Sequence, residues 1–217
     1  VRKGVNDDEI ADIVRHALEW RCVRGVTFQP IQDAGRNEGF DPRTDRIVLS
    51  EIRRAVAGSG VFGLDDLIPL PCNPDQICIG YGLREGREVT PVTSLLPRDW
   101  LVAEAPNTVT FEAFPELRAR VFDLLSLSTA QADTSDRLAS LLCCLPQAAV
   151  PAEITYENTF RVVVSQFLDR FNFDLGSVKR SCVHFVEPDG RIYPFDTFNT
   201  FYRPGAPGAA VREAGRS

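Results

Sequence analysis

The chain contains 217 residues, of which 44% are hydrophobic and 25% are charged, a composition typical of a folded protein with one large or two small domains. Its 30 acidic residues outnumber its 24 basic ones and give a net charge of −6, which excludes the basic surface that nucleic-acid binding requires. Prolines at 146 and 151 interrupt the most apolar segment, residues 138–152. No apolar run therefore reaches the roughly 20 residues of a membrane-spanning helix.

The beginning of the chain gives an expectation about the whole polypeptide. The sequence holds no methionine, and Val1 is followed within a few residues by sequence typical of a fold's interior, with no basic and apolar leader. We therefore expect a cytoplasmic protein and interpret the chain as a piece of a longer polypeptide whose N-terminal part is missing.

Six cysteines form an even set, at positions 22, 72, 78, 143, 144 and 182. Disulfides are possible, but the chain is larger than disulfide-dense secreted scaffolds and shows no export signal. The adjacent pair Cys143 and Cys144 would also form a strained bridge. Free thiols or a metal site in a reducing cytosol are the favoured interpretation.

The first elements follow the alternation of an α/β fold. Asn6 and Glu9 have the spacing of a capping box, and apolar residues recur at helical spacing from Ile10 to Trp20. The stretch "VTFQP" then predicts a short strand that ends at Pro30. The loop "QDAGR" follows that strand, at the end where such folds bind their ligands.

The middle of the chain is predicted to combine helices with one long irregular segment. A second helix is expected after Asp41 and Pro42, ending at the "GSG" of residues 58–60. Residues 61–83 are rich in Pro and Gly and predict an irregular segment that serves a site. Further helices are predicted over three ranges: 115–128, 135–145 and 157–171. Residues 206–217 predict a disordered tail.

The stretch "SCVHFVEPDGRIYPFDTFN", residues 181–199, predicts a β-hairpin with a turn at Glu187–Gly190. Because side chains alternate along a strand, Cys182 and His184 share one face, while Val183 and Phe185 share the other. We expect the Cys182 face to turn inward over the region of Cys72, and the other face to pack against the predicted helix 157–171.

Cysteines on separate elements are the candidate metal ligands, namely Cys72, Cys143, Cys144 and Cys182. Thiolates suit zinc and iron–sulfur clusters alike, and the sequence contains no CxxC pair that would indicate a site by spacing. The alternative is that these cysteines bind no metal and are buried, reduced thiols. Sequences typical of other catalytic sites (GxSxG, HExxH, a Walker loop and GxGxxG) are missing.

Several phrases together resemble a known group of proteins. They are "GVTFQPI", "DLIPLPCNPD", "LLCCLP", "TYENTFRVVVSQFLDRFNFD" and "KRSCVHFVEPDGRIYPFDTFNTFYR". Over residues 5–203 they resemble the C-terminal two-thirds of radical S-adenosylmethionine proteins of the group that includes the archaeal tetraether lipid synthases. The resemblance implies an α/β fold in which residues 1–60 end a partial TIM-like barrel. Residues 61–204 would form an α+β extension with a SPASM-like hairpin, and residues 205–217 a tail.

The resemblance also implies cofactors and candidate site residues. Gln29, Gly35 and Arg36 would face bound S-adenosylmethionine, and an arginine there would meet its carboxylate. Cys72, Cys182 and the Cys143–Cys144 pair would hold an auxiliary [4Fe-4S] cluster. Two departures from the group's pattern limit these expectations. The CxxxCxxC loop that binds the S-adenosylmethionine-cleaving cluster is not in this chain, and the second cysteine of the SPASM hairpin is replaced by Phe195-Asp196.

The leading hypothesis is therefore a fragment of a radical S-adenosylmethionine enzyme. In the whole enzyme a 5′-deoxyadenosyl radical would activate a C–H bond of a small-molecule or lipid substrate, with an electron-donor protein as partner and no nucleic acid. The alternative from another class is a non-catalytic binding domain that zinc on the same thiolates stabilises.

Overall fold

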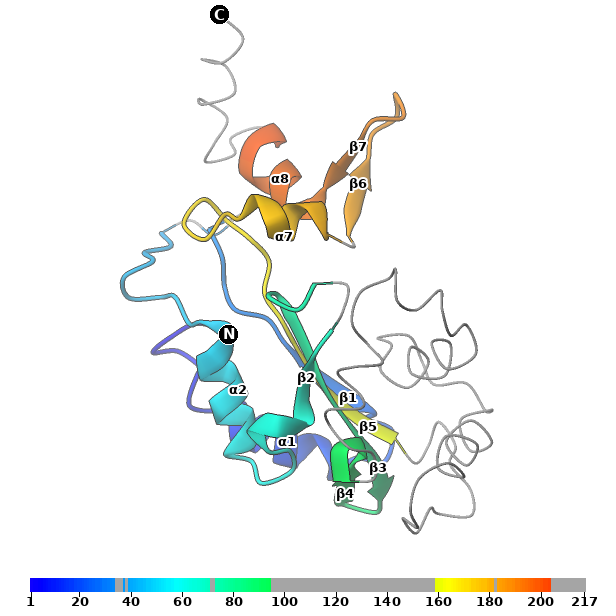
Figure 1. Cartoon of the computed structure of the whole chain (residues 1–217). Coiled ribbons are helices and arrows are strands. Elements are labelled where there is room, and N and C mark those ends of the chain that lie inside the picture. The colour runs from blue at the N-terminus through cyan, green and yellow to red at the C-terminus, as the bar shows by residue number, and fades with distance from the viewer. Residues whose placement is uncertain (34–36, 38, 71–72, 95–158, 182, 204–217) are drawn as a thin grey trace, which may run out of the picture.

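The computed structural model describes residues 1–33, 37, 39–70, 73–94, 159–181 and 183–203. These residues form a mixed α/β fold with a five-stranded sheet, two helices against it and a separate two-stranded hairpin (Figure 1). No helix among them is long and apolar enough to cross a membrane. The helices predicted over 115–128 and 135–145 and the predicted tail lie outside this part of the chain.

The sheet is mixed, and one of its two inner strands comes from late in the sequence. Its members are β1 (Gly25–Phe28), β2 (Leu67–Pro69), β3 (Ile77–Glu85), β4 (Glu88–Pro91) and β5 (Thr159–Ser165). The order is β1-β5-β3-β2, and β4 pairs with β3. β1 runs parallel to β5, whereas every pairing of β3 is antiparallel.

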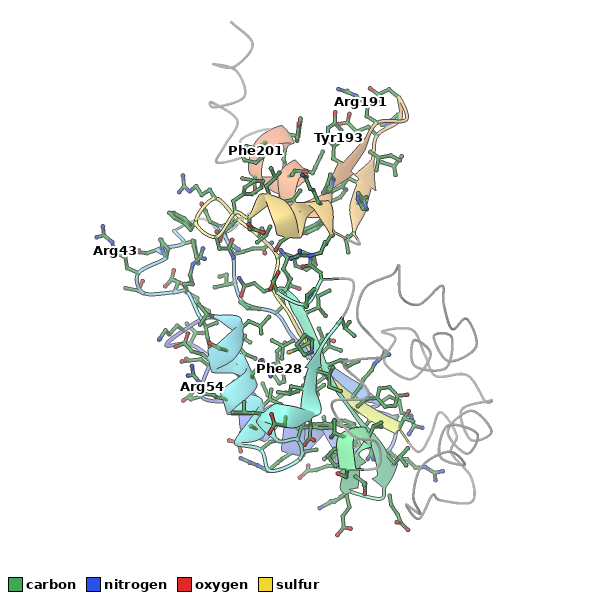
Figure 2. The ribbon with its side chains drawn as sticks, viewed as in Figure 1. Phe28, Arg43, Arg54, Arg191, Tyr193 and Phe201 are labelled. Atoms are coloured by element: carbon green, nitrogen blue, oxygen red, sulfur yellow. The ribbon has the colours of Figure 1, made fainter. Side chains whose placement is uncertain are left out.

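Two helices, α1 (Ile10–Ala17) and α2 (Leu49–Ala57), bury apolar stripes against the sheet. Ile10 and Val14 from α1 and Ile52 and Val56 from α2 have no exposed surface, and each such side chain stabilises the fold by about 1.5–3 kcal/mol. Phe28 at the end of β1 lies between the sheet and the helices (Figure 2).

The two helices start later than the sequence predicted. The Asn6 side chain accepts a hydrogen bond from the backbone N–H of Arg2 (2.8 Å) and so stabilises the preceding turn, while α1 begins at Ile10. The predicted helix after Asp41 is instead a turn in which the Asp45 carboxylate accepts the N–H of Asp41 (2.9 Å). In both places a short polar side chain competes with the helix for backbone groups.

The prediction of an irregular segment over residues 61–83 was wrong, because this segment holds β2 and most of β3. Seven consecutive residues of β3, from Cys78 to Arg84, are buried. A strand covered on both faces lacks the alternation that reveals strands. Its glycines allow close packing, since a Cβ on Gly82 would lie 2.4 Å from Val89 Cγ1.

The predicted amphipathic helix 157–171 was also wrong, because its first half is strand β5. Phe160, Val162, Val163 and Val164 are all buried. This run of β-branched residues fits a strand packed on both faces better than a helix, where β-branched side chains lose χ1 freedom.

The hairpin prediction is confirmed. β6 (His184–Val186) pairs antiparallel with β7 (Ile192–Pro194), and Gly190 closes the turn with a φ of 84°. Short helical segments surround the hairpin: α7 (Leu175–Lys179), α8 (Phe195–Thr197) and η4 (Phe198–Tyr202).

The predicted packing of the hairpin was wrong. Phe185 packs on Phe195 and Phe198, with ring centroids 5.4 Å and 4.5 Å apart, instead of on a helix at 157–171. His184 is exposed rather than turned inward. The adjacent segment, residues 195–202, supplies the aromatic rings that Phe185 contacts, although all three residues of β6 remain exposed.

Candidate functional site

The candidate site lies where the parallel strands β1 and β5 end. In parallel α/β sheets the loops that bind ligands follow the carboxyl ends of the strands. The segments that follow β1 and β5 leave the sheet together and run toward α7 (Figure 1). They meet at Asp33 and Asp169, although these residues are 136 positions apart.

Asp169 is the centre of this site. Asp169 has no exposed surface. Its two carboxylate oxygens accept four hydrogen bonds. The Arg46 Nη2 atom donates to both oxygens (2.7 and 2.6 Å), the Asp33 N–H donates to Oδ2 (2.9 Å), and the Phe171 N–H donates to Oδ1 (2.8 Å). A buried carboxylate is stable only with such complete pairing.

Aromatic rings flank the arginine that pairs with this carboxylate. The Arg46 guanidinium lies 5.9 Å from the centroid of Phe40 and 5.5 Å from that of Phe171. Arg170 lies 4.7 Å from the Phe171 centroid and forms an ion pair with Asp33 (2.6 Å). Two cations, two carboxylates and two rings therefore fix the loop geometry at this edge.

Three buried polar atoms at this edge have no hydrogen-bond partner among the described residues. Asp33 Oδ2 is one of them, but it is ion-paired with Arg170. The other two are Gln32 Oε1, an acceptor, and Arg46 Nε, a donor. A buried polar atom without a partner costs free energy. The arrangement suits a polar ligand that offers both a donor and an acceptor.

A second polar cluster joins the loop after β2 to α7. Asn73, 1% exposed, donates from Nδ2 to Gln76 Oε1 (2.7 Å) and to the Ser177 carbonyl (3.3 Å). Asp75 forms an ion pair with Arg180. Asn73 directly follows Cys72 in the sequence, and Arg180 stands two positions before Cys182. The chain segments next to these two cysteines are therefore in contact.

Of the predicted cofactor-contacting residues, only Gln29 lies in the part of the chain that the structure describes. It follows β1 directly, at the expected edge, and its side chain is exposed. Gly35 and Arg36 lie outside the described residues. The role of all three stays a prediction.

The four predicted metal ligands, Cys72, Cys143, Cys144 and Cys182, also lie outside the described residues, so the ligand set stays a prediction. Among the residues that are described, no three His, Cys, Asp or Glu side chains are grouped to hold a metal ion.

Cys78, which is not among the predicted metal ligands, is a core residue of β3 and is 1% exposed. Burial raises the pKa of its thiol to about 11. A metal ligand must be a thiolate, so this environment favours an inert, protonated thiol. Cys22, by contrast, is exposed.

Asp196 connects the hairpin region to the candidate site. It is 1% exposed, and its Oδ1 accepts the backbone N–H of Leu168 (2.7 Å), the residue before Asp169. Burial raises the pKa of this carboxyl above its ordinary value, against the opposing effect of the Leu168 hydrogen bond. Asp196 is one of the two residues that stand where the SPASM pattern has its second cysteine.

Comparison with known proteins finds one distant homology. No protein-family model matches the chain. The chain is 24% identical, over 238 aligned residues, to a 7,8-dihydro-6-hydroxymethylpterin dimethyltransferase of Methanocaldococcus jannaschii. The alignment covers 93% of this chain and 47% of that relative. The chain thus spans about half the length of the relative.

Sequence reasoning missed Asp169 and Arg46. The predicted helix 157–171 would have placed Asp169 on a solvated face. A usable signal was present, because "FLDRFNF" sets an adjacent Asp and Arg among three phenylalanines, two residues after a run of three valines. Charged residues in such a setting are buried only when they are paired.

We expect Asp169→Ala to destabilise the protein by about 3–5 kcal/mol, because it leaves the Arg46 guanidinium and two backbone N–H groups without their acceptor. Chemical unfolding of the full-length protein measures this loss. The matched control is Asp12→Ala in α1, which breaks an exposed ion pair with Arg15 and should cost less than about 1 kcal/mol. Equal effects of the two variants would contradict the assigned role of Asp169.

We expect Asp196→Asn to stabilise the protein relative to the wild type as pH rises. The folded-state pKa of Asp196 is raised, so its contribution to stability is full below the unfolded pKa and is lost as pH rises through the folded pKa. Asparagine keeps the acceptor for Leu168 and does not ionise. The measurement is the difference in thermal midpoint between Asp196→Asn and the wild type, followed from about pH 3 to pH 7. This pH interval includes the range in which carboxyl groups ordinarily titrate.

Asp189→Asn is a control of opposite sign. The Arg191 N–H and guanidinium lower the pKa of this exposed turn carboxyl, so its stabilising contribution is present at neutral pH and is lost as pH falls. The stability of the wild type relative to Asp189→Asn should therefore increase as pH rises. If the stability difference from the wild type changed with pH in the same direction for both variants, the assigned effect of burial on Asp196 would be contradicted.

Proposed function

We propose that the chain is part of a radical S-adenosylmethionine enzyme and that the whole enzyme transfers methyl groups or activates a C–H bond of a small molecule. The observation that carries this proposal is the homology to a pterin dimethyltransferase over 93% of the chain. It agrees with the resemblance of five separate sequence phrases to the radical S-adenosylmethionine group.

The candidate site supports a role in holding S-adenosylmethionine. The amino-acid end of this molecule carries an ammonium donor and a carboxylate acceptor. Gln32 Oε1 and Arg46 Nε are the buried acceptor and donor that lack partners among the described residues. We propose that they bind this end together with Arg36 and Gln29, while Gly35 allows close approach of the backbone. The Asp169 carboxylate would act as a positioning group for Arg46.

The second polar cluster supports an auxiliary [4Fe-4S] cluster on Cys72, Cys182 and the Cys143–Cys144 pair. Ligand side chains must converge within a few ångströms of one centre. The Asp75–Arg180 ion pair and the Asn73–Ser177 hydrogen bond hold the flanking segments of Cys72 and Cys182 together. Asn73 Oδ1 and Gln76 Nε2 are buried without partners among the described residues. Gln76 Nε2, a donor, fits hydrogen bonding to a thiolate or sulfide.

In such enzymes the cluster on the CxxxCxxC loop, which is not in this chain, would supply the electron that cleaves S-adenosylmethionine, and an electron-donor protein would reduce that cluster. The residues of this chain would bind and orient the cofactor and exclude water from it. The name of the relative favours a heterocyclic small molecule over a lipid as substrate. The lipid branch of the resembling group is the alternative substrate class.

The competing function is a non-catalytic binding domain with zinc on the same thiolates. Metal content separates the two: anaerobically reconstituted full-length protein should be brown and contain iron under the first proposal, and colourless with stoichiometric zinc under the second. Formation of 5′-deoxyadenosine on reduction, in the presence of S-adenosylmethionine, then tests the activity itself.

We expect Cys72→Ser and Cys182→Ser to remove about four iron atoms per chain from the reconstituted full-length protein, since each would open a [4Fe-4S] ligand set. Cys22→Ser is the matched control, because Cys22 is an exposed thiol of this chain and its loss should leave the iron content unchanged. Unchanged iron in both ligand variants would remove the auxiliary cluster from the proposal while leaving the enzyme class intact.

We expect Arg36→Ala to weaken S-adenosylmethionine binding to the full-length protein about tenfold or more, because hydrogen bonds to a charged group contribute about 1.5–3 kcal/mol. Calorimetric titration measures the affinity. Arg43→Ala is the control: Arg43 is an exposed cation seven positions further along, and its side chain extends away from the fold (Figure 2). An equal affinity of the two variants would exclude Arg36 from the cofactor site.

A further inference from the structure

The first residue of the chain is hydrogen-bonded like a member of the sheet. The Val1 nitrogen, which is the terminal ammonium of the sequence and would be a backbone amide in a longer polypeptide, donates to the Gln29 carbonyl (2.5 Å). The Ile31 N–H donates to the Val1 carbonyl (2.8 Å). One residue that bonds in this way to both neighbours of Pro30 shows the bonding pattern of two parallel strands. Val1 therefore lies opposite Pro30, in line with the extension of β1.

The backbone groups of β1 alternate between two edges. The Arg24 carbonyl accepts from the Arg161 N–H (3.1 Å), and Gly25 stands opposite Arg161 in the parallel register with β5. Even-numbered residues of β1 thus bond to β5, and the N–H and C=O groups of Gly25, Thr27 and Gln29 point the other way. β1 ends the strand order, so no described strand pairs with this outer edge.

We propose that the outer edge of β1 binds a parallel strand formed by the residues that directly precede Val1 in the full-length polypeptide. The contact between Val1 and Pro30 sets its register. By the two-residue repeat of a strand, the second residue before Val1 lies opposite Phe28, and the fourth lies opposite Val26. The Thr27 N–H then donates to that fourth residue, and the Thr27 carbonyl accepts from the second.

The position of α1 supports this occupant. Parallel neighbours need a crossover of roughly a dozen residues or more, usually through a helix. Residues 2–24 provide that length, and α1 packs against β1. The new strand, α1 and β1 would form one βαβ unit. A strand from a second copy is disfavoured because Val1 of the same chain already occupies the end of the edge.

Amide hydrogen exchange at single-residue resolution in the full-length protein tests the proposal. We expect the amides of Thr27 and Gln29 to be protected to the same degree as those of Val26 and Phe28. An open edge predicts alternation instead, with Thr27 and Gln29 exchanging on the order of 100-fold faster, because unpaired amides open at little cost in free energy. Alternating protection would overturn the proposal.

A proline pair gives a second measurement in the same full-length protein. Val26→Pro removes a bond to β5 and should lower the thermal midpoint whatever lies outside β1. Thr27→Pro should lower it to a similar extent if the outer edge is paired, whereas proline with its missing N–H toward solvent is tolerated on an edge strand. A tolerated Thr27→Pro overturns the proposal. So does protection that disappears on dilution to the monomer, which would assign the edge to a second copy. Neither readout depends on S-adenosylmethionine or iron, so the outcome is independent of the proposed function.

Discussion

The parallel pairing of β1 with β5 is the constraint on which the rest of the structure depends. Val26 pairs with Val162, so β5 lies beside a strand from near the start of the chain. β2, β3 and β4 all lie between these two strands in the sequence. Such a long separation costs loop-closure entropy, and the buried core of β5, with Phe160, Val162 and Val164 against the helices, offsets that cost. Once the two strands lie side by side, their carboxyl ends coincide, and the polar residues after each strand become neighbours.

The buried Asp169 carboxylate fixes the positions of the segments that meet there. Its four hydrogen bonds come from three segments: the loop after β1, the turn before α2, and the chain just after β5 itself. Desolvating a carboxylate costs several kcal/mol, which a single ion pair rarely returns. A group of this kind is a poor way to gain stability and a good way to hold one arrangement of loops. A ligand-binding edge needs such a fixed arrangement of loops more than it needs additional stability.

The sequence was sufficient for the elements whose pattern is local. The stripe of Ile10, Val14 and Ala17 predicted α1, "VTFQP" predicted β1, and the Pro-Asp-Gly turn predicted the hairpin. It failed for β3 and β5, because strands buried on both faces carry no alternation, and the glycines of β3 also suggested a loop. Gly82 is small because Val89 and Thr90 cross closely beside it, a contact that only the assembled sheet creates. Asp169 was missed for the same reason, since its partners are distant in sequence.

The placement of the antiparallel strands also determines how the sheet is able to grow. β2, β3 and β4 are inserted between α2 and β5, and β3 lies on the side of β5 away from β1. An antiparallel neighbour there ends the parallel part of the sheet on that side, because βαβ units add parallel strands only where helices cover the faces. The helices α1 and α2 are both associated with the opposite side, with β1 and β5. Among the described strands, the parallel part of the sheet is therefore able to continue at the edge of β1, where Val1 is already hydrogen-bonded.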